Sequence, residues 1–512
     1  MADRATPGER TTQVHRWLVL ALMCSGLLLV AMDNTILNVA LPAIADELRP
    51  GNTALLWIVD LYSLVVAGLL VTAGTASDRS GRKKFFLIGM ALFGISSVVA
   101  AFSGSIEVLL ASRVLRGIGG AMIMPATLSV IRNVFTDSRE RGVAIGIWSA
   151  TASAGSAIGP ILAGAALQYF HWGSVFLISL PIVVVAMVLT VIYVPESRDP
   201  SPGRFDPLSV VLSMAAVVGV VYGVKELAGH GLAPVATAVL LAGLTLAFTF
   251  VRRQGKLDSP LLDLSLFKAR RFVAATLSVL LSFFGFFGLL FFLTQYFQIL
   301  RGYSPLETGL WLLPLALASV VAAPLTGAIV ARTGTRVTLA GAFALLSISL
   351  GVFSLLGGEN DTLLIVLGFL GVGFGASVAV TAGSQAIMTS APPERAGGAA
   401  AIQETSFELG AGLGVALLGS VMAALYSTAM TRFTDTAASE SLPAAAVAAS
   451  KLDGPQAAAL MDAAKAAFID GLSAAALVGA GVMLITAVLA AVWLPPLAVE
   501  REELAAGAGG DW

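Results

Sequence analysis

The sequence is poor in the residues on which soluble enzymes and secreted domains depend. Its one cysteine, Cys24, excludes an intrachain disulfide and a cysteine-rich metal site. Charged residues make up 12% of the 512 positions, against about 25% in a typical soluble domain. The three histidines, His15, His171 and His230, lack metal-ligand spacing. A net charge of −1 leaves no basic surplus for nucleic acid. We therefore expect no metal, no nucleic-acid partner and no enzyme active site.

Apolar residues are abundant, at 57% of the chain. A helix needs about 20 apolar residues to cross the hydrocarbon core of a bilayer. Runs of this kind predict an all-α integral membrane protein with 14 transmembrane helices, at residues 17–41, 54–75, 84–104, 107–131, 142–167, 174–194, 207–227, 232–251, 272–299, 307–331, 336–356, 362–390, 397–426 and 471–494.

Most of the 30 Lys and Arg residues fall in alternate loops between these runs, and the densest group lies at residues 252–271. Positive residues collect on the cytoplasmic side of membrane proteins. This pattern predicts a multi-pass protein of the cell inner (plasma) membrane with both termini in the cytoplasm. The even number of spans agrees with this, because it places both termini on the same side.

Two segments break the alternation of spans and short loops. Residues 195–206 form a polar, proline-rich linker, and residues 427–470 form a long alanine-rich loop with spaced charges on the extracellular side. The long loop is compatible with a short hairpin of amphipathic helices and equally with a disordered connector.

A specific motif follows the second span, where the chain reads GTASDRSGRKKFF. Gly74, Asp78, Arg79, Gly81 and Arg82 stand in a spacing that resembles the loop signature of the major facilitator superfamily. Gly81 permits a tight turn, and Asp78 can pair with a loop arginine or lie at a helix N-terminus.

A degenerate copy, GAIVARTGTR, begins at Gly327 and has Ala331 in place of the aspartate. It predicts two structurally related halves.

The fifth span carries a second motif, with Gly155, Gly159, Pro160 and Gly164 in a spacing that resembles the superfamily's antiporter signature. Small residues at i and i+4 allow close helix packing, and an internal proline bends a helix. In the family this pattern marks exporters rather than importers.

Nearly the whole chain resembles fourteen-span drug:proton antiporters, most closely the QacA-type exporters of quaternary ammonium compounds. The segments LVAMDNTILNVALPAI, WIVDLYSLVVAG and AAIQETSFELGAGLG carry this likeness. It implies the major facilitator fold, with two six-helix bundles plus two inserted helices. The expected domains are residues 1–200, an insert with spans seven and eight at 201–256, and residues 257–512.

Four acids and one arginine at membrane depth are the candidate sites for proton coupling and cation recognition: Asp33, Asp60, Glu404, Glu408 and Arg113. An ionisable side chain there costs about 2.5–3.5 kcal/mol on insertion scales, so it usually has a function. Glu404 and Glu408 share one helix face, and a cation could displace a proton shared between them. Asp33 and Asp60 could serve an outward-facing vestibule.

Arg113 stands at a depth that matches Asp33. A structural ion pair is one interpretation, and the resemblance favours proton coupling.

Aromatic residues in or beside the spans could form a pocket for flat cations through cation–π contacts. The candidates are Trp57, Tyr62, Trp148, Phe287, Phe291 and Trp311.

These observations predict a proton-coupled multidrug efflux antiporter that exports lipophilic cations such as quaternary ammonium compounds, dyes and antiseptics by alternating access. A nucleotide-binding loop is absent from the sequence, so we expect no cofactor, the proton gradient as the energy source, and a monomer in the bilayer. The alternatives are a dedicated exporter of one endogenous metabolite, antibiotic or lipid, and a channel, against which the antiporter motif argues.

Overall fold

The computed structural model describes residues 7–48, 52–198, 206–230, 233–257, 260, 264–357, 361–391, 396–431, 433, 437–439, 442–452 and 454–497. This part of the chain is helical, and it contains no strand. The elements are α1 (Pro7–Leu48), α2 (Asn52–Ser80), α3 (Arg82–Ala101), α4 (Ile106–Val134), α5 (Ser138–Tyr169), α6 (Ser174–Leu177), α7 (Ser179–Tyr193), α8 (Pro207–His230), α9 (Pro234–Gln254), the 3-10 helix η1 (Leu264–Lys268), α10 (Arg270–Gln295), the π-helix η2 (Tyr296–Leu300), α11 (Pro305–Trp311), α12 (Leu313–Phe353), α13 (Thr362–Ser390), α14 (Ala396–Met430), the 3-10 helix η4 (Ala437–Ser439), α15 (Leu442–Ala449) and α16 (Gly454–Trp493).

Thirteen helices in the described part of the chain are long and apolar enough to cross a membrane. The segment Leu306–Phe353, at 48 residues, is long enough for two crossings of about 20 residues. Gly334, inside it, has a φ of 79° and breaks the helical path. The two spans predicted at 307–331 and 336–356 therefore lie on either side of this break.

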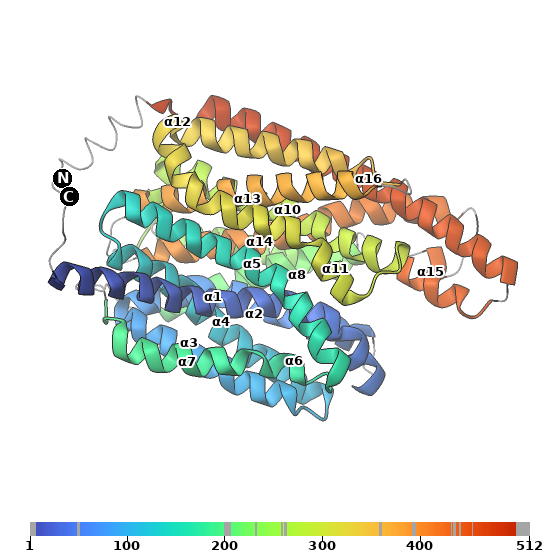
Figure 1. Cartoon of the computed structure of the whole chain (residues 1–512), viewed down its shortest axis with the longest axis horizontal. Helices are drawn as coiled ribbons and strands as arrows, with labels where there is room; N and C mark the ends of the chain where they lie inside the picture. The colour runs from blue at the N-terminus through green and yellow to red at the C-terminus, as the bar shows by residue number, and fades with distance from the viewer. Residues whose placement is uncertain are drawn as a thin grey trace.

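The helices form two bundles that lie side by side with their long axes roughly parallel (Figure 1). The N-terminal bundle comprises α1–α7, in which α1 packs on α5, and α4 on both α2 and α3. The C-terminal bundle comprises α10–α16, in which α12 packs on α13 and α16, and α10 on α14. The bundles meet where α5 contacts α12 and α2 contacts α14.

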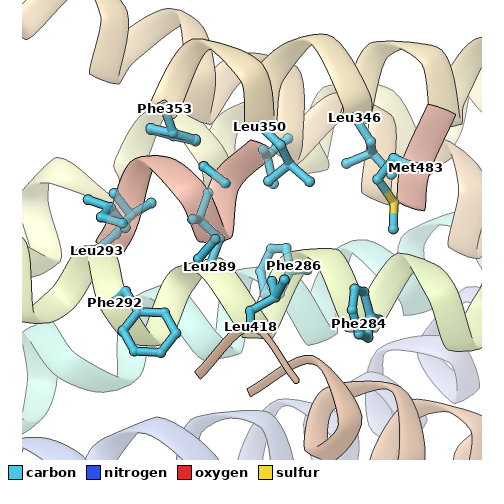
Figure 2. Close-up of a cluster of buried hydrophobic side chains, with 14 of the residues drawn as sticks. Phe284, Phe286, Leu289, Phe292, Leu293, Leu346, Leu350, Phe353, Leu418 and Met483 are labelled. Atoms are coloured by element: carbon cyan, nitrogen blue, oxygen red, sulfur yellow. The ribbon is translucent and has the colours of Figure 1, made fainter. Parts of the chain in front are cut away.

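The centre of the C-terminal bundle is a dense apolar core around α10 (Figure 2). Phe284 and Phe286 of α10 belong to this cluster together with Leu350 of α12, Met483 of α16 and Leu418 of α14. A Cβ atom added at Gly288 would lie 2.7 Å from Leu418, so α10 and α14 need a glycine at this contact. Close van der Waals packing of this kind holds membrane helices together, since lipid is as apolar as the core.

The bundles share a core at one end, which we call the basic end because most of the Lys and Arg residues of the loops, among them Lys83, Arg141 and Arg252, lie there. Buried residues from both bundles, including Phe86, Phe135, Phe272 and Met388, belong to one apolar cluster. Gln385 of α13 donates a hydrogen bond to the Gly142 carbonyl of α5 at 3.0 Å. At the opposite end, which we call the far end, the N-terminal bundle has an apolar cluster of its own.

The inserted helices α8 and α9 pack on each other at the seam between the bundles. The first, α8, contacts both α2 and α14, whereas α9 lies on the outside of α8.

The segment predicted as a long loop at 427–470 is largely helical. Helix α14 continues to Met430, η4 and α15 follow, and α16 begins at Gly454, well before the predicted start of the last span. Leu442 and Ala445 of α15 are buried, in the same apolar cluster as Phe468 of α16. The helical hairpin is therefore confirmed over the disordered connector, because α15 has an apolar face that α16 covers (Figure 1).

Candidate functional site

A buried ion cluster joins α1 to α4. Arg113 donates a hydrogen bond from Nη1 to Asp33 Oδ2 at 2.8 Å, and Nε of Arg116 lies 2.6 Å from Asp33 Oδ1, although that N–H is not aligned as a hydrogen bond. All three residues are at most 2% exposed. The predicted pairing of Arg113 with Asp33 is thus confirmed, and Arg116 is a second partner of the same carboxylate.

Neighbouring groups hold both guanidiniums in place. Arg113 donates from Nε to the Ile58 carbonyl at 3.0 Å, and Arg116 donates from Nη1 to the Ser97 hydroxyl at 2.8 Å. The Arg113 guanidinium also lies 4.8 Å from the centre of the Tyr62 ring. Buried charges need this degree of pairing to offset their desolvation.

The ion cluster does not open on a vestibule. Asp33 is 1% exposed and lies outside the lining of the cavity described below. Asp60 lies in α2, but its side chain is outside the described residues.

A cavity of about 190 Å³ lies between the two bundles. Helices α1, α2, α4 and α5 line it from one side, and α10, α13 and α14 from the other. Its polar groups include Asn34, Ser63, Ser282 and Ser377. Glu408 is the one ionisable side chain among the described residues that line it. A site with several apolar walls and one carboxylate suits a lipophilic cation.

Stacked aromatic rings form one wall of this cavity across both bundles. Trp148 of α5 stacks on Phe407 of α14 at 6.3 Å between ring centroids, and Phe407 stacks on Phe283 of α10 at 4.1 Å. Phe283 in turn stacks on Phe287 at 5.6 Å. The indole N–H of Trp148 donates to the Thr127 hydroxyl at 3.0 Å, which fixes the ring.

Of the six predicted pocket aromatics, Trp148 and Phe287 line the cavity. Three others lie elsewhere: Tyr62 against the ion cluster, Trp57 stacked on Tyr222 of α8, and Trp311 stacked on Tyr303 and Phe297. The side chain of Phe291 is outside the described residues.

Phe407 was missed because it is one aromatic residue between the two glutamates, with no aromatic cluster around it in the sequence. Its position directly before Glu408 was the available signal.

The paired glutamates of α14 have different environments. Glu408 lines the cavity and is partly exposed. Glu404, one turn closer to the basic end, is fully buried, and neither of its carboxylate oxygens has a hydrogen-bond partner among the described residues. The amide of Gln403 is likewise buried without a partner there. The acid that faces the cavity is therefore Glu408 rather than Glu404.

The loop motif after α2 forms the turn that its glycines predict. Gly81 has a φ of 113°, which L side chains rarely adopt. Asp78 accepts a hydrogen bond from Nε of Arg82 at 2.8 Å, and both side chains are buried. Gly74 is buried on α2, and Arg79 is partly buried beside Asp78.

Glu196, in the linker after α7, completes this turn. Its carboxylate accepts the backbone N–H groups of Lys83 at 3.1 Å and Lys84 at 3.2 Å, at the N-terminus of α3. A carboxylate is favourable at this position because of the helix dipole. Sequence reasoning missed it, since 113 residues separate the partners.

The antiporter motif of α5 makes close contact with α1. A Cβ atom added at Gly155 would lie 2.8 Å from Ala31, and one added at Gly159 would collide with the Thr35 hydroxyl. Pro160 lies inside α5. Gly164 faces Leu306 at the start of α11, across the seam between the bundles. The motif therefore acts as a packing surface.

The described residues contain no group of three or more His, Cys, Asp or Glu side chains that could hold a metal ion.

Comparison with known proteins identifies the family. The sequence model of the Major Facilitator Superfamily matches residues 23–415. The multidrug efflux pump LfrA of Mycolicibacterium smegmatis is 40% identical over 95% of this chain and 98% of its own length. The methyl viologen resistance protein SmvA of Salmonella typhimurium is 37% identical over 92% of this chain and 96% of its own.

A solved structure of the human organic anion transporter MFSD10 has the same fold. It aligns with a TM-score of 0.62 at 16% identity, over 93% of this chain and 99% of that one. The predicted superfamily and its all-helical fold are thus confirmed, whereas the likeness to QacA-type exporters stays a prediction.

Proposed function

This chain belongs to the major facilitator superfamily of transporters, and we propose that it exports lipophilic cationic drugs in exchange for protons. Its relatives are drug efflux pumps and resistance proteins. Members of this superfamily are secondary transporters and not enzymes, so the energy would come from an ion gradient.

The composition of the cavity carries the proposal. Trp148, Phe407 and Phe283 present a stacked aromatic wall, and Glu408 supplies one negative charge. Aromatic faces and a carboxylate together attract a flat, delocalised cation. Methyl viologen, which the name of one relative mentions, is such a cation.

Glu404 is our candidate for the proton-carrying group. A buried carboxylate without a counter-ion is costly when it is ionised, and Glu404 has no such partner among the described residues. Glu408, one helical turn away, carries the charge that the drug would meet. A cation bound at Glu408 offsets the repulsion between the two carboxylates and so favours proton release from Glu404; drug binding at Glu408 and proton binding at Glu404 are therefore competing events.

The proton gradient supplies the energy in this proposal. Each charge that crosses the membrane potential is worth about 2.3 kcal/mol per 100 mV, so inward protons can drive outward cations. We place the basic end and both termini in the cytoplasm, in the inner membrane of the cell, because positive loops are retained on that side. The two bundles would then rock about the cavity to expose it on alternate sides.

Transport of ethidium by proteoliposomes tests the proposal. An imposed pH gradient should drive uptake against the dye gradient in the wild type. Glu408→Gln should weaken the apparent dye affinity at least about tenfold, which corresponds to about 1.4 kcal/mol for the lost attraction. Glu404→Gln should bind the dye but lose its dependence on the pH gradient.

Glu107→Gln is the matched control, because Glu107 lies in the exposed first turn of α4, away from the cavity. It should transport like the wild type. Dye transport that ignores the pH gradient would overturn proton exchange, and an unchanged dye affinity in Glu408→Gln would overturn the cavity as the drug site.

A further inference from the structure

The inserted helix α9 is the span most open to lipid. Only 17% of its membrane window is buried inside the protein, the lowest share among the thirteen spans of the described chain. Its main contact with the rest of the described chain is with α8. Its outer face is therefore a surface for lipid, and no residue of α9 lines the drug cavity.

One stripe of α9 is apolar and exposed along its length. Leu241, Leu244, Phe248 and Val251 are 59%, 49%, 64% and 45% exposed. Their spacing of three, four and three residues places them on one helix face. The stripe runs toward the basic end and meets Arg252, which is exposed there.

In the last turn of α9, two other side chains bond to residues at the start of α8, and these contacts fix the rotation of α9. Arg253 pairs with Asp206 at 2.9 Å, and Gln254 donates to the Ser209 hydroxyl at 2.7 Å. Arg252 in the same turn and Lys256 just after it are exposed. Neither forms an ion pair with any described residue.

The short helix η1 begins beside this place and leads to two more cations. The side chain of Leu264 lies 3.8 Å from the Cβ position of Gly255, so η1 begins beside the last turn of α9. Leu266 is buried and anchors η1. Lys268 and Arg270 follow, both exposed and without an ion pair among the described residues. At about 2 Å per residue, Lys268 is about 8 Å farther along.

We propose that Arg252, Lys256, Lys268 and Arg270 bind the phosphate headgroup of an anionic phospholipid, whose acyl chain lies along the apolar stripe of α9. The general bias of positive residues toward one side of the membrane accounts for the charges alone. It does not account for four exposed cations near the end of an exposed apolar stripe that form no ion pair among the described residues, whereas Arg253 of α9 is paired. A free phosphate ion would use the cations and leave the stripe unused.

Native mass spectrometry of the detergent-solubilised full chain tests the proposal. The protein is titrated with phosphatidylglycerol and, separately, with phosphatidylcholine of identical acyl chains. The first phosphatidylglycerol should bind more tightly than the first phosphatidylcholine. Each cation near an anionic headgroup contributes about fivefold, so Arg252→Gln/Lys256→Gln should weaken this binding by at least fivefold and leave phosphatidylcholine unchanged.

Two variants separate the site from general effects of charge and folding. Lys451→Gln/Lys465→Gln removes two cations from the far-end segment and should keep the preference for phosphatidylglycerol. Arg252→Lys should also keep it, because the charge remains. Phe248→Ala should weaken both lipids together, since it shortens the stripe.

Equal affinity of the wild type for the two lipids would overturn the proposal. So would an undiminished preference in Arg252→Gln/Lys256→Gln that elutes and melts like the wild type. Displacement of the bound lipid by millimolar inorganic phosphate, with no effect of Phe248→Ala, would identify a phosphate-ion site and likewise overturn a lipid site.

Discussion

Neutralising Asp33 should destabilise the protein strongly, because its carboxylate balances two buried guanidiniums. Arg113 and Arg116 lie 2.8 and 2.6 Å from its oxygens, and all three residues are at most 2% exposed. Removing one partner of a buried ion pair costs about 3–5 kcal/mol, since an uncompensated charge stays behind. Asp33→Asn keeps the size of the side chain, so we expect this loss to arise from charge.

The free energy of unfolding, measured by titration with sodium dodecyl sulfate in mixed micelles, tests this prediction. Asp33→Asn/Arg116→Met removes one positive charge together with the negative one and should recover part of the loss. Asp361→Asn is a comparison at the far end, where Arg301 is 25% exposed and water can compensate. A loss below about 1 kcal/mol in Asp33→Asn, or no recovery in the double variant, would refute the role of Asp33 as the counter-ion.

Three further predictions concern the turn at Gly81, the contact of Gly159 with α1, and the carboxylate of Asp206. Gly81→Ala should lose at least about 1–2 kcal/mol in the same unfolding assay, because L residues are strained at a φ of 113°; an unaltered midpoint would contradict this. Gly159→Leu should lose about 1–3 kcal/mol from overpacking against Thr35, and wild-type stability would show that α1 and α5 can separate. Hydrogen bonding by the Ser209 hydroxyl lowers the pKa of Asp206 below its ordinary value of 3.8. A carboxylate with a lowered pKa stabilises the folded state above the ordinary value, and this stabilisation is lost as the pH falls through the lowered one. The stability difference between wild type and Asp206→Asn should thus be constant from pH 7 to about 5 and shrink below about 4; a difference that is flat across this range would count against the contact.

The two glutamates of α14 differ in their exposure to the cavity, and this difference could not be predicted from the sequence. Their spacing of four predicts one shared helix face. That spacing does not show which of the two meets the cavity. The answer depends on how deeply α14 sits against α2 and α4, and there Glu408 reaches the cavity while Glu404 is covered.

The aromatic residues illustrate the same limit. Trp148 and Phe287 could be proposed for a pocket from their types alone, and so could Trp57 and Trp311. The structure places the first two on the cavity and the other two at contacts with α8 and at the far end of the C-terminal bundle. Residue type indicates what a side chain can bind, whereas its neighbours decide whether anything can reach it.

The sequence by itself determined the membrane class, the approximate position of the spans and the tight turn at Gly81. These features are local, because a span needs only a run of apolar residues and a positive φ needs only a glycine. Tertiary structure decided the second arginine on Asp33, the Glu196 carboxylate at the start of α3 and the lining of the cavity. These contacts join residues that are far apart in the chain. They exist only because particular helix faces meet, which the periodicity of a single helix cannot specify.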